Sequence, residues 1–365
     1  MPQPRALSLK SSYRYHNPCD RGRIDRIGRR LWRGAALNIT TKQAALLENV
    51  QTAWNQGRLY APANSSESKT LSILVAHDFL TRPLRGLYAP RGAWDDRSLS
   101  PRKRLRIKAN GYAAAHPNAI FCAYTAAALH GLWVSRARYR ELDIISQTMT
   151  GKQATNPIVR WPARNFAEYT DRDPARTQIV PTLAMCMLDA PLPESLALVD
   201  SALHFKLTTK EEIGRFLATS CHGSRGIKRA FDSLRLADER PDNGGESVVR
   251  GMITEAGYMP PTQLQADFPD PIDGSTHRVD MFWITPTGGV IGEVDGMEKY
   301  SSNEAQSTHV LVQERQRESH LTSLGYPVMR ILYSRVNEPD YLPKLLQSFH
   351  IPRLTNPSCH KRQQQ

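Results

Sequence analysis

The sequence predicts an α+β protein of several domains, with a winged helix-turn-helix near its N-terminus, a helical connector, and an α/β domain near its C-terminus. Three observations predict this class. The 365 residues, 40% of them apolar, suffice for two or three domain cores at roughly 100–200 residues per domain. Stretches with the hydrophobic spacing of helices and stretches with that of strands both occur along the chain. The charge is also divided: residues 1–243 carry 37 basic and 21 acidic groups, whereas residues 244–350 carry 8 and 14.

The net charge favours a polyanionic partner. Lys and Arg number 48 against 35 Asp and Glu, which gives a formal charge of +13. A basic front binds a polyanion by displacing its counterions, so DNA is the expected partner, and the acidic rear concentrates carboxylates for another purpose. An anionic membrane surface is the other polyanion to consider, but no basic helix carries the bulky apolar face that such binding needs.

Neither membrane spans nor disulfides are expected. No run approaches the roughly 18 consecutive apolar residues of a spanning helix, and residues 1–20 lack the apolar core of a signal peptide. The five cysteines are odd in number and far apart, which fits neither a disulfide framework nor a zinc site. We therefore expect a cytoplasmic protein with reduced cysteines and no membrane partner.

Residues 1–34 are predicted to form a disordered basic arm. They hold nine basic and two acidic groups with only scattered apolar residues, so they cannot bury enough surface to offset the entropy of ordering. The arm either contacts the polyanion or is an incidental soluble tail, and both alternatives stay open.

Residues 35–180 carry the pattern of a winged helix-turn-helix with bracing strands. Apolar residues at spacings of three and four predict a helix that begins at Thr40. A second short helix is predicted within residues 68–80. Two extended pieces about a Pro/Arg/Gly turn in residues 81–92 predict the hairpin of a wing. Strand-like runs in residues 138–180 are expected to brace this region.

The stretch after the hairpin is predicted to bind DNA. In SPRKRLRIKANGYAAAHP, residues 100–117, five basic residues crowd the start of a predicted helix, where positive charge opposes the helix dipole and favours nearby phosphates. A charged face that is merely solvated is the alternative. Together with two arginines of the hairpin, the predicted DNA-binding residues are Arg82, Arg85, Arg102, Lys103, Arg104, Arg106 and Lys108.

The phrases RGLYAP and AYTAAALHGLW resemble the amino-terminal winged-helix region of AbiEi-type antitoxins and of a larger actinobacterial group built like them. The resemblance covers about residues 35–135 and is carried by short apolar phrases. In that family the winged helix binds operator DNA to autoregulate a toxin–antitoxin pair. The resemblance therefore implies DNA binding, and a cognate toxin as a partner, without implying catalysis.

Residues 181–237 are predicted to form the helical connector. LTTKEEIGRFLA opens with a capping box of Thr208 and Glu211, and SRGIKRAFDSLRL carries a second amphipathic face. Residues 238–245, DERPDNGG, have nothing to bury and are predicted to be the linker before the last domain.

Residues 244–350 show the order helix, strand, strand, strand, long helix, strand and a last helix. The first six elements follow the core order of the restriction-endonuclease-like fold. The long helix is expected over residues 303–324 and the last helix over residues 341–349, and residues 351–365 form a tail.

Three carboxylates lie in the middle strands of this order. Asp280 lies in HRVDMFW, and Glu293 and Asp295 follow in GVIGEVDG beyond a Thr-Pro-Thr-Gly-Gly turn. Acids in apolar strands are costly to bury unless they are paired or bind a metal, and converging carboxylates favour Mg²⁺ or Mn²⁺. Phosphodiester hydrolysis uses such an ion to polarise the phosphoryl oxygen and activate water. Lys299 is the candidate base, and Glu246 the candidate outer carboxylate.

The phrases ESVVRGMITEAG, RVDMFW, GEVDGMEKY and ERQRESHLTSLGYPVMRI resemble the endonuclease domain at the carboxyl end of many actinobacterial proteins. That domain is related to the very-short-patch repair endonucleases of the PD-(D/E)xK superfamily. The match covers about residues 244–337. It implies that Asp280 is the metal-binding Asp of the first motif and Glu293 the acid of the second.

Two departures from the family pattern bear on activity. Asp295 stands where the superfamily usually has Lys, and Tyr300 where repair-type relatives tend to have a His base. Lys299, four residues beyond Asp295, is the stand-in. Two functions therefore compete: a DNA-binding metal-dependent endonuclease, and a non-catalytic, antitoxin-like transcriptional regulator whose last domain keeps the fold without the activity.

Overall fold

The computed structural model places most of the chain. The residues that it describes are 39–149, 151–155, 157–163, 166, 170–172, 174–270, 274–296, 323 and 325–354. Within them the protein is a mixed α+β structure with eleven α-helices and four small sheets, which confirms the prediction of an α+β protein. The basic arm, Lys299, Tyr300 and nearly all of the predicted long helix lie outside the described residues.

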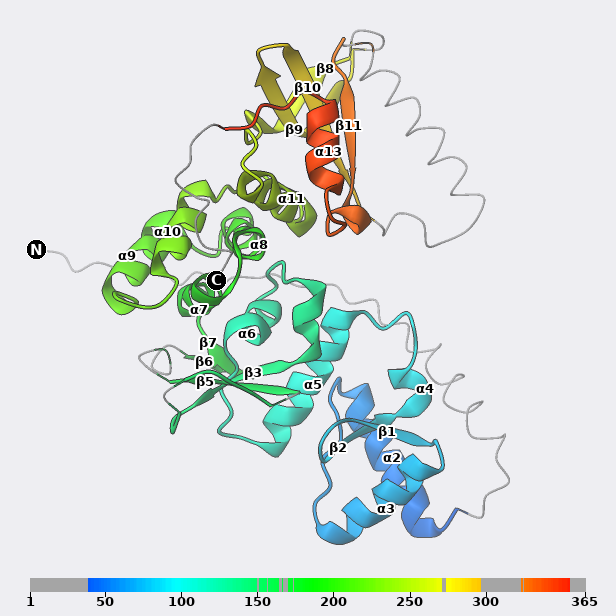
Figure 1. Ribbon diagram of the computed structural model, residues 1–365. Coiled ribbons are helices and arrows are strands. Elements are labelled where there is room, and N and C mark those ends of the chain that lie inside the picture. Colours follow the sequence, from blue (N-terminus) through cyan, green and yellow to red (C-terminus); the bar gives the residue numbers. More distant parts are fainter. Residues whose placement is uncertain are drawn as a thin grey trace, which may run out of the picture.

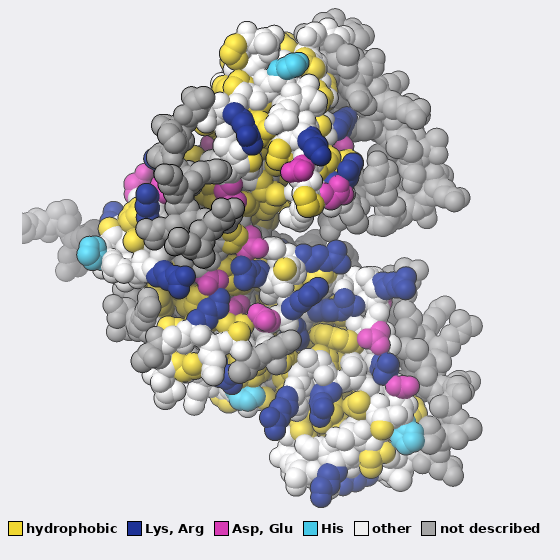
Figure 2. Space-filling model, in the orientation of Figure 1, with side chains coloured by type: hydrophobic (Ala, Val, Ile, Leu, Met, Phe, Trp, Pro, Cys, Tyr) yellow, Lys and Arg dark blue, Asp and Glu magenta, His cyan; other side chains and the backbone are white. Residues whose placement is uncertain are grey.

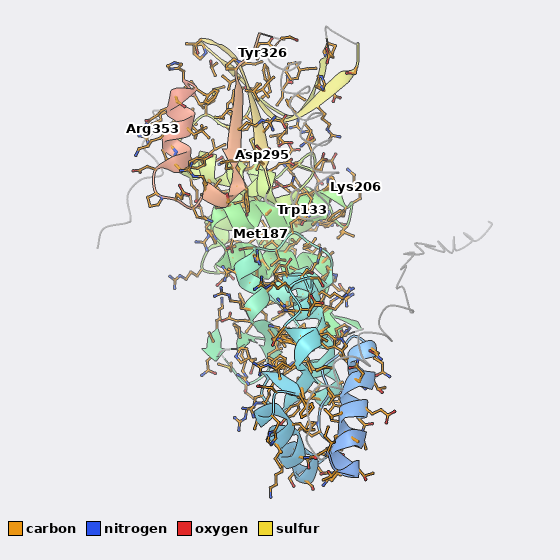
Figure 3. The ribbon with its side chains drawn as sticks, turned by 90° about the vertical axis from the view of Figure 1, so that its right-hand side faces the viewer. Trp133, Met187, Lys206, Asp295, Tyr326 and Arg353 are labelled. Carbon is orange, nitrogen blue, oxygen red and sulfur yellow. The ribbon has the colours of Figure 1, made fainter. Side chains whose placement is uncertain are left out.

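The molecule has three parts in a row (Figure 1). Two helices and a hairpin lie at one end, a four-stranded sheet lies at the opposite end, and helices with small sheets lie between them. The side view in Figure 3 shows the same order, with Trp133 and Lys206 near the middle and Tyr326 in the C-terminal part.

The N-terminal end folds into two helices and an antiparallel hairpin, which are α2 (Thr41–Asn55), α3 (Ser65–Ala76), β1 (Leu80–Leu84) and β2 (Leu87–Pro90). Thr40 begins α2 as predicted, because its hydroxyl accepts a hydrogen bond from Gln43 N and the Gln43 side chain accepts one from Thr40 N. α3 begins ahead of the predicted stretch, since the Asn64 side chain caps it. Leucines of both helices pack with the hairpin in one small core.

The predicted basic stretch forms a long helix next to three short ones; the elements are α4 (Arg91–Trp94), α5 (Pro101–Ala115), α6 (Ala123–Leu129) and the 3₁₀ helix η1 (Arg136–Arg140). Ser100 caps α5 by accepting a hydrogen bond from Lys103 N, and Pro101 occupies the first helical position, where an N–H would have no partner. Leu105 and Ile107 of α5 face a core shared with the hairpin and α6.

Small sheets follow, made of the strands β3 (Leu142–Ser146), β4 (Gln153–Thr155), β5 (Ile158–Pro162), β6 (Thr170–Arg172) and β7 (Ala175–Thr177). β5 pairs with β3 in parallel and with β4 in antiparallel fashion, and β6 pairs with β7. β3 and β5 are the predicted bracing strands. The other three have three residues each, too few for a hydrophobic pattern to mark them.

The predicted connector consists of four helices, α7 (Ile179–Asp189), α8 (Leu192–His204), α9 (Lys210–Ser220) and α10 (Ile227–Leu236). Their apolar faces share one core. That core also holds Cys122, Cys186 and Cys221, which are buried and not joined in disulfide bonds, so the prediction of reduced structural cysteines is confirmed for these three.

The capping box of α9 lies one residue later than predicted. Thr209 accepts a hydrogen bond from Glu212 N at 3.2 Å, and the Glu212 side chain accepts one from Thr209 N at 3.3 Å. Thr208, the predicted cap, instead donates its hydroxyl to Glu212 at 2.7 Å. Glu211 is exposed. Two adjacent threonines before two glutamates allow either register of the box, and the sequence pattern alone could not choose between them.

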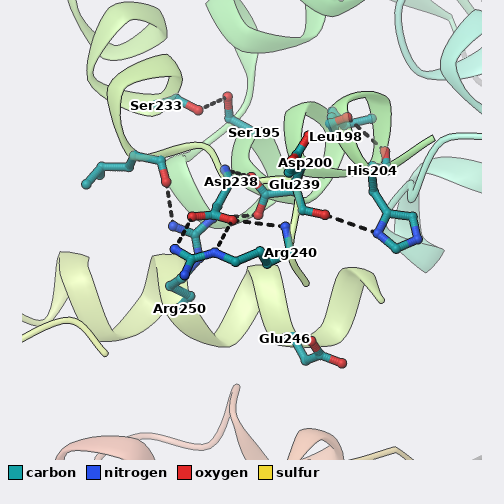
Figure 4. A network of polar contacts seen from close by, with 12 residues as sticks. Ser195, Leu198, Asp200, His204, Ser233, Asp238, Glu239, Arg240, Glu246 and Arg250 are labelled. Atoms are coloured by element: carbon teal, nitrogen blue, oxygen red, sulfur yellow. Dashed lines mark hydrogen bonds and ion pairs between the residues drawn. The ribbon is translucent and has the colours of Figure 1, made fainter. Parts of the chain in front are cut away.

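The segment before the last domain is not the free linker that its composition predicts. Pro241 is buried, and Asp238 N donates to Asp200 Oδ1 at 2.8 Å. The helix that follows, α11 (Gly244–Glu255), packs along α8. Its Arg250 donates to Asp200 Oδ2 at 2.5 Å, with both side chains buried (Figure 4). The prediction of a free linker is wrong because Asp238 N and the Arg250 side chain bond to Asp200 of the connector instead of to water.

The C-terminal sheet has the order β11-β10-β9-β8, with the strands β8 (Gln263–Pro269), β9 (Thr276–Thr285), β10 (Gly288–Asp295) and β11 (Val328–Leu332). β8, β9 and β10 form an antiparallel meander, and β11 lies parallel to β10. α11 and α13 (Tyr341–Ser348) pack on one apolar layer, which includes Met281, Trp283 and Ile331. The described elements follow the predicted order.

Candidate functional site

A line of polar side chains crosses the C-terminal sheet. Leu264 pairs with Met281 and Ala266 with Val279, so Gln265 of β8 falls opposite Asp280 of β9. Extending the β9–β10 register by one step beyond Met281 and Gly292 places Asp280 opposite Glu293 of β10. Glu293 in turn is paired with Arg330 of β11. Gln265, Asp280, Glu293 and Arg330 follow one another across the four strands of the sheet, and we call them the polar row.

Asp280 is held from both neighbouring strands. Val294 N donates to its Oδ2 at 2.7 Å, and Gln265 Nε2 lies 3.5 Å from its Oδ1. Gln265 has a φ of 51°, a left-handed conformation that non-glycine residues adopt rarely and that clusters at functional sites. The Asp280 carboxylate is therefore fixed in position, and its oxygens lie close to the β10 backbone.

Glu246 joins this row from the first turn of α11. Its carboxylate accepts hydrogen bonds from Asp242 N at 3.0 Å, Asn243 Nδ2 at 2.5 Å and Gln265 Nε2 at 2.7 Å. Burial raises the pKa of Glu246 to about 8, and the negative charge of Asp280 adds to this shift. The predicted outer carboxylate thus lies one side chain away from Asp280, bridged by Gln265.

Glu293 is a buried acid of the polar row, with 5% of its surface exposed. It follows Gly292, where a Cβ would lie 2.5 Å from the Trp283 ring. β10 can therefore pass close to this ring only with glycine at that position, and the Glu293 side chain projects from the strand directly beyond it. A carboxylate enclosed to this degree needs a cation or several donors near it.

Asp295 has a different environment. It lies two residues beyond Glu293 on β10, and Arg330 Nη1 donates to its Oδ1 at 3.2 Å. Figure 3 shows Asp295 at the end of the sheet nearer to the connector helices, and Tyr326 at the far end. The ion pair with Arg330 already balances the charge of Asp295, so a metal ion would have to compete for this carboxylate.

The predicted three-carboxylate metal site is not assembled. Across the described part of the chain, no three His, Cys, Asp or Glu side chains are arranged so that they could hold a metal ion. Of the three predicted ligands, Asp295 is the one that is engaged elsewhere, because Arg330 donates a hydrogen bond to its carboxylate. Mg²⁺, however, commonly binds through one or two protein carboxylates together with water and substrate phosphates. Asp280 and Glu293 fit such a two-carboxylate ion in number and chemistry, and the continued register of β9 and β10 brings them to neighbouring positions.

Five of the predicted DNA-binding residues are exposed: Arg82 and Arg85 on the hairpin, and Arg102, Lys103 and Arg106 on α5. Arg102 and Arg104 bind the protein's own backbone. Arg102 is exposed, but its Nη2 donates to Leu132 O at 3.3 Å, whereas the half-buried Arg104 donates to Trp94 O at 3.1 Å and Asp96 O at 2.8 Å.

The structure corrects the predicted DNA-binding surface at Lys108. This side chain is 7% exposed, and its Nζ donates to Tyr139 O at 3.2 Å and Arg140 O at 2.7 Å. Burial lowers the pKa of Lys108 to about 8. Its position on α5 points it at η1 and away from solvent, so it joins two elements of the fold and cannot reach a DNA phosphate.

Sequence reasoning missed two members of the polar row, Gln265 and Arg330. Neither lies in a motif that marks it. The signal that identifies them is the strand register, because each stands opposite an acid that the sequence did single out.

No family model, curated protein or solved structure matches this chain significantly. Among the helices that the structure describes, none is long and apolar enough to cross a membrane.

Proposed function

We propose that this chain is a DNA-binding protein whose C-terminal domain is a metal-dependent endonuclease. The observation that carries the proposal is the β9–β10 register, whose continuation by one step brings Asp280 and Glu293 opposite each other, together with the Gln265 side chain that bridges Glu246 and Asp280. The charge of Asp280 adds to the burial that raises the pKa of Glu246, and a cation bound beside these acids would offset their repulsion.

The arrangement of elements supports the proposal. A helix, an antiparallel meander of three strands, and a fourth strand parallel to the third follow the core order of the restriction-endonuclease-like fold. At the other end, α2, α3 and the β1–β2 hairpin have the order of a winged helix-turn-helix. Figure 2 shows many Lys and Arg side chains over the part of the molecule that carries α2 to α10, on the face that it displays.

Each residue of the site has a role in this proposal. Asp280 and Glu293 would hold Mg²⁺ or Mn²⁺, which when bound polarises the phosphoryl oxygen and lowers the pKa of attacking water. Gln265 and the Val294 N–H orient the Asp280 carboxylate. Arg330 places positive charge beside the acids, where it limits their repulsion. Lys299 stays the candidate base.

A cleavage time course on plasmid and single-stranded DNA with Mn²⁺ tests the proposal. Glu293→Gln should abolish cleavage, because it keeps the shape of the side chain and removes the charge that holds the ion. Lys299→Ala should leave a trace of cleavage, since a general base typically raises the rate by a factor of about 10²–10⁴. Asp267→Asn, an exposed acid on β8, is the control and should cut like the wild type. Unchanged cleavage by Glu293→Gln would point to another site or a contaminant.

A second function, a non-catalytic transcriptional regulator, is favoured by one observation: the residue that stands where the superfamily usually has Lys is Asp295, and its carboxylate is bound to Arg330. In this alternative the winged helix binds DNA and a toxin is the partner. Wild-type protein that cleaves no substrate but binds DNA upstream of its own gene would support it. A toxin-like nucleotidyltransferase gene next to that gene would add to the support.

A further inference from the structure

A pocket of about 430 Å³ opens between α4, the first turns of α5, and η1, far along the chain from the polar row. Its lining contains no acidic residue among those described. It does contain two aromatic and four basic residues, which are Trp94, Arg104, Lys108, Arg136, Tyr139 and Arg140. In Figure 2, Lys and Arg side chains gather on the face that displays the α5 region of Figure 1.

Two of these cations form the floor of the pocket. Lys108 Nζ is bound to the carbonyls of Tyr139 and Arg140, which fixes η1 against α5. Arg104 donates through Nη2 to Trp94 O and Asp96 O, but its Nε is buried and has no hydrogen-bond partner within the described residues. A buried N–H of a charged group without an acceptor is costly, so a small movement of the Arg104 side chain would let this Nε donate to a ligand.

The other two cations form the rim. Arg136 and Arg140 lie at the two ends of η1 and are exposed, and their guanidinium groups make no hydrogen bond or ion pair with any residue that the structure describes. Two acids lie close to the pocket without lining it. Asp96 accepts a hydrogen bond from Ser98 N at 2.8 Å, and the charge of Glu141 raises the pKa of Lys108 against the larger effect of burial.

We propose that this pocket binds the phosphate of a nucleotide, with Arg136, Arg140 and Arg104 as donors. Guanidinium groups offer paired N–H donors that match phosphate oxygens. The volume exceeds what a bare phosphate needs and lies within the range of about 300–1,000 Å³ that small-molecule sites occupy. Trp94 and Tyr139 supply aromatic surface beside which a base can lie. The phosphate comes either from a free nucleotide or from the end of a DNA strand.

Calorimetric titration of the full chain at low salt tests the pocket. The probes are inorganic phosphate, AMP, and one DNA duplex prepared with a 5′-phosphate and with a 5′-hydroxyl. Arg136→Ala/Arg140→Ala removes both rim donors, and Lys228→Ala/Arg235→Ala removes the same charge from exposed positions on α10. The rim variant should lose affinity about tenfold or more for the phosphate probe that binds the wild type, whereas the control should match the wild type. Melting temperatures verify that both variants fold.

These probes distinguish a free nucleotide from a DNA strand end as the source of the phosphate. Binding of AMP that the rim variant loses assigns a free nucleotide, and a 5′-phosphate preference that the rim variant loses assigns a strand end. The proposal is overturned if no phosphate probe binds the wild type, or if rim and control variants lose equal affinity. Glu293→Gln should bind as the wild type does, so failure of the nuclease proposal leaves this result intact.

Discussion

The two ends of the molecule use their charged side chains in opposite ways. Around α5, several cations donate to the protein's own carbonyls, as Arg104 does to Trp94 and Asp96. In the C-terminal domain, Glu246 of α11 and Asp280 of β9 accept hydrogen bonds from neutral donors and lie near each other. The net charge of a segment therefore does not show which charges a ligand can reach. Whether a ligand can reach a charged group depends on the hydrogen-bond and ion-pair partners of that group within the protein.

Lys108 and Glu246 show the same difference between the two regions in the surroundings of a single buried charge. Both are buried and both have a pKa of about 8, shifted mainly by burial. Lys108 is held by carbonyl dipoles, whereas Glu246 has a like-charged neighbour in Asp280. Dipoles around a buried charge indicate a structural role, and a like charge nearby indicates a site for a ligand of the opposite sign.

The largest effect is expected where the two ends are joined, at the buried pair of Arg250 and Asp200. Arg250→Met leaves Asp200 buried without its cation, so the free energy of unfolding should fall by about 3–5 kcal/mol. Arg240→Met, which breaks the more exposed pair with Asp238, should cost less than about 1 kcal/mol. Chemical denaturation followed by circular dichroism measures both. Equal losses in the two variants would mean that the buried pair does not stabilise the contact of α11 with the connector.

The next effect separates a structural lysine from one that binds DNA. Below pH 8, Lys108 is protonated in both states, so the folded protein carries the full cost of burying its charge. Between pH 8 and 10.5 the unfolded state binds the extra proton, and stability should rise with pH relative to Lys108→Met, by up to about 3 kcal/mol. Denaturation of both proteins between pH 7 and 10 measures this difference. A flat difference across that range would contradict the assignment.

The element order was predictable from the sequence because it rests on local patterns. The caps of α2 and α5 and the hairpin that brings Asp280 towards Glu293 are signalled by residues close together in the chain. The partners of the charged groups are not local. Lys108 binds carbonyls more than 30 residues away, and Gln265 meets Asp280 only because β8 takes one register on β9. A slip of one residue would turn Gln265 to the other face.

A third effect should distinguish two acids of β9 and β10. Asp280→Asn should abolish the stabilisation by Mn²⁺, which for an ion at a hundred times its Kd is about 2.7 kcal/mol. Asp295→Asn should keep most of it, because Arg330 already holds this carboxylate in the wild type. Thermal melts with and without Mn²⁺ give both values. If Asp295→Asn loses as much as Asp280→Asn, then the ion displaces Arg330 and the three-carboxylate site of the sequence prediction is restored.

The smallest effect concerns the exposed cations near α5. Arg82, Arg85, Lys103 and Arg106 are exposed, and each phosphate contact contributes about 0.9 to the slope of log K against log salt. Replacing all four by Ala should therefore reduce the magnitude of this slope by about 3 to 4, and Lys103→Ala alone by about 0.9. Lys108→Met removes the same unit of charge from the same helix, yet should leave the slope unchanged, because its ammonium is bound to two carbonyls inside the fold. Binding of a duplex to the full chain between 50 and 200 mM salt measures these slopes. A loss in Lys108→Met equal to that in Lys103→Ala would place both lysines on the DNA and end the distinction between buried and exposed cations.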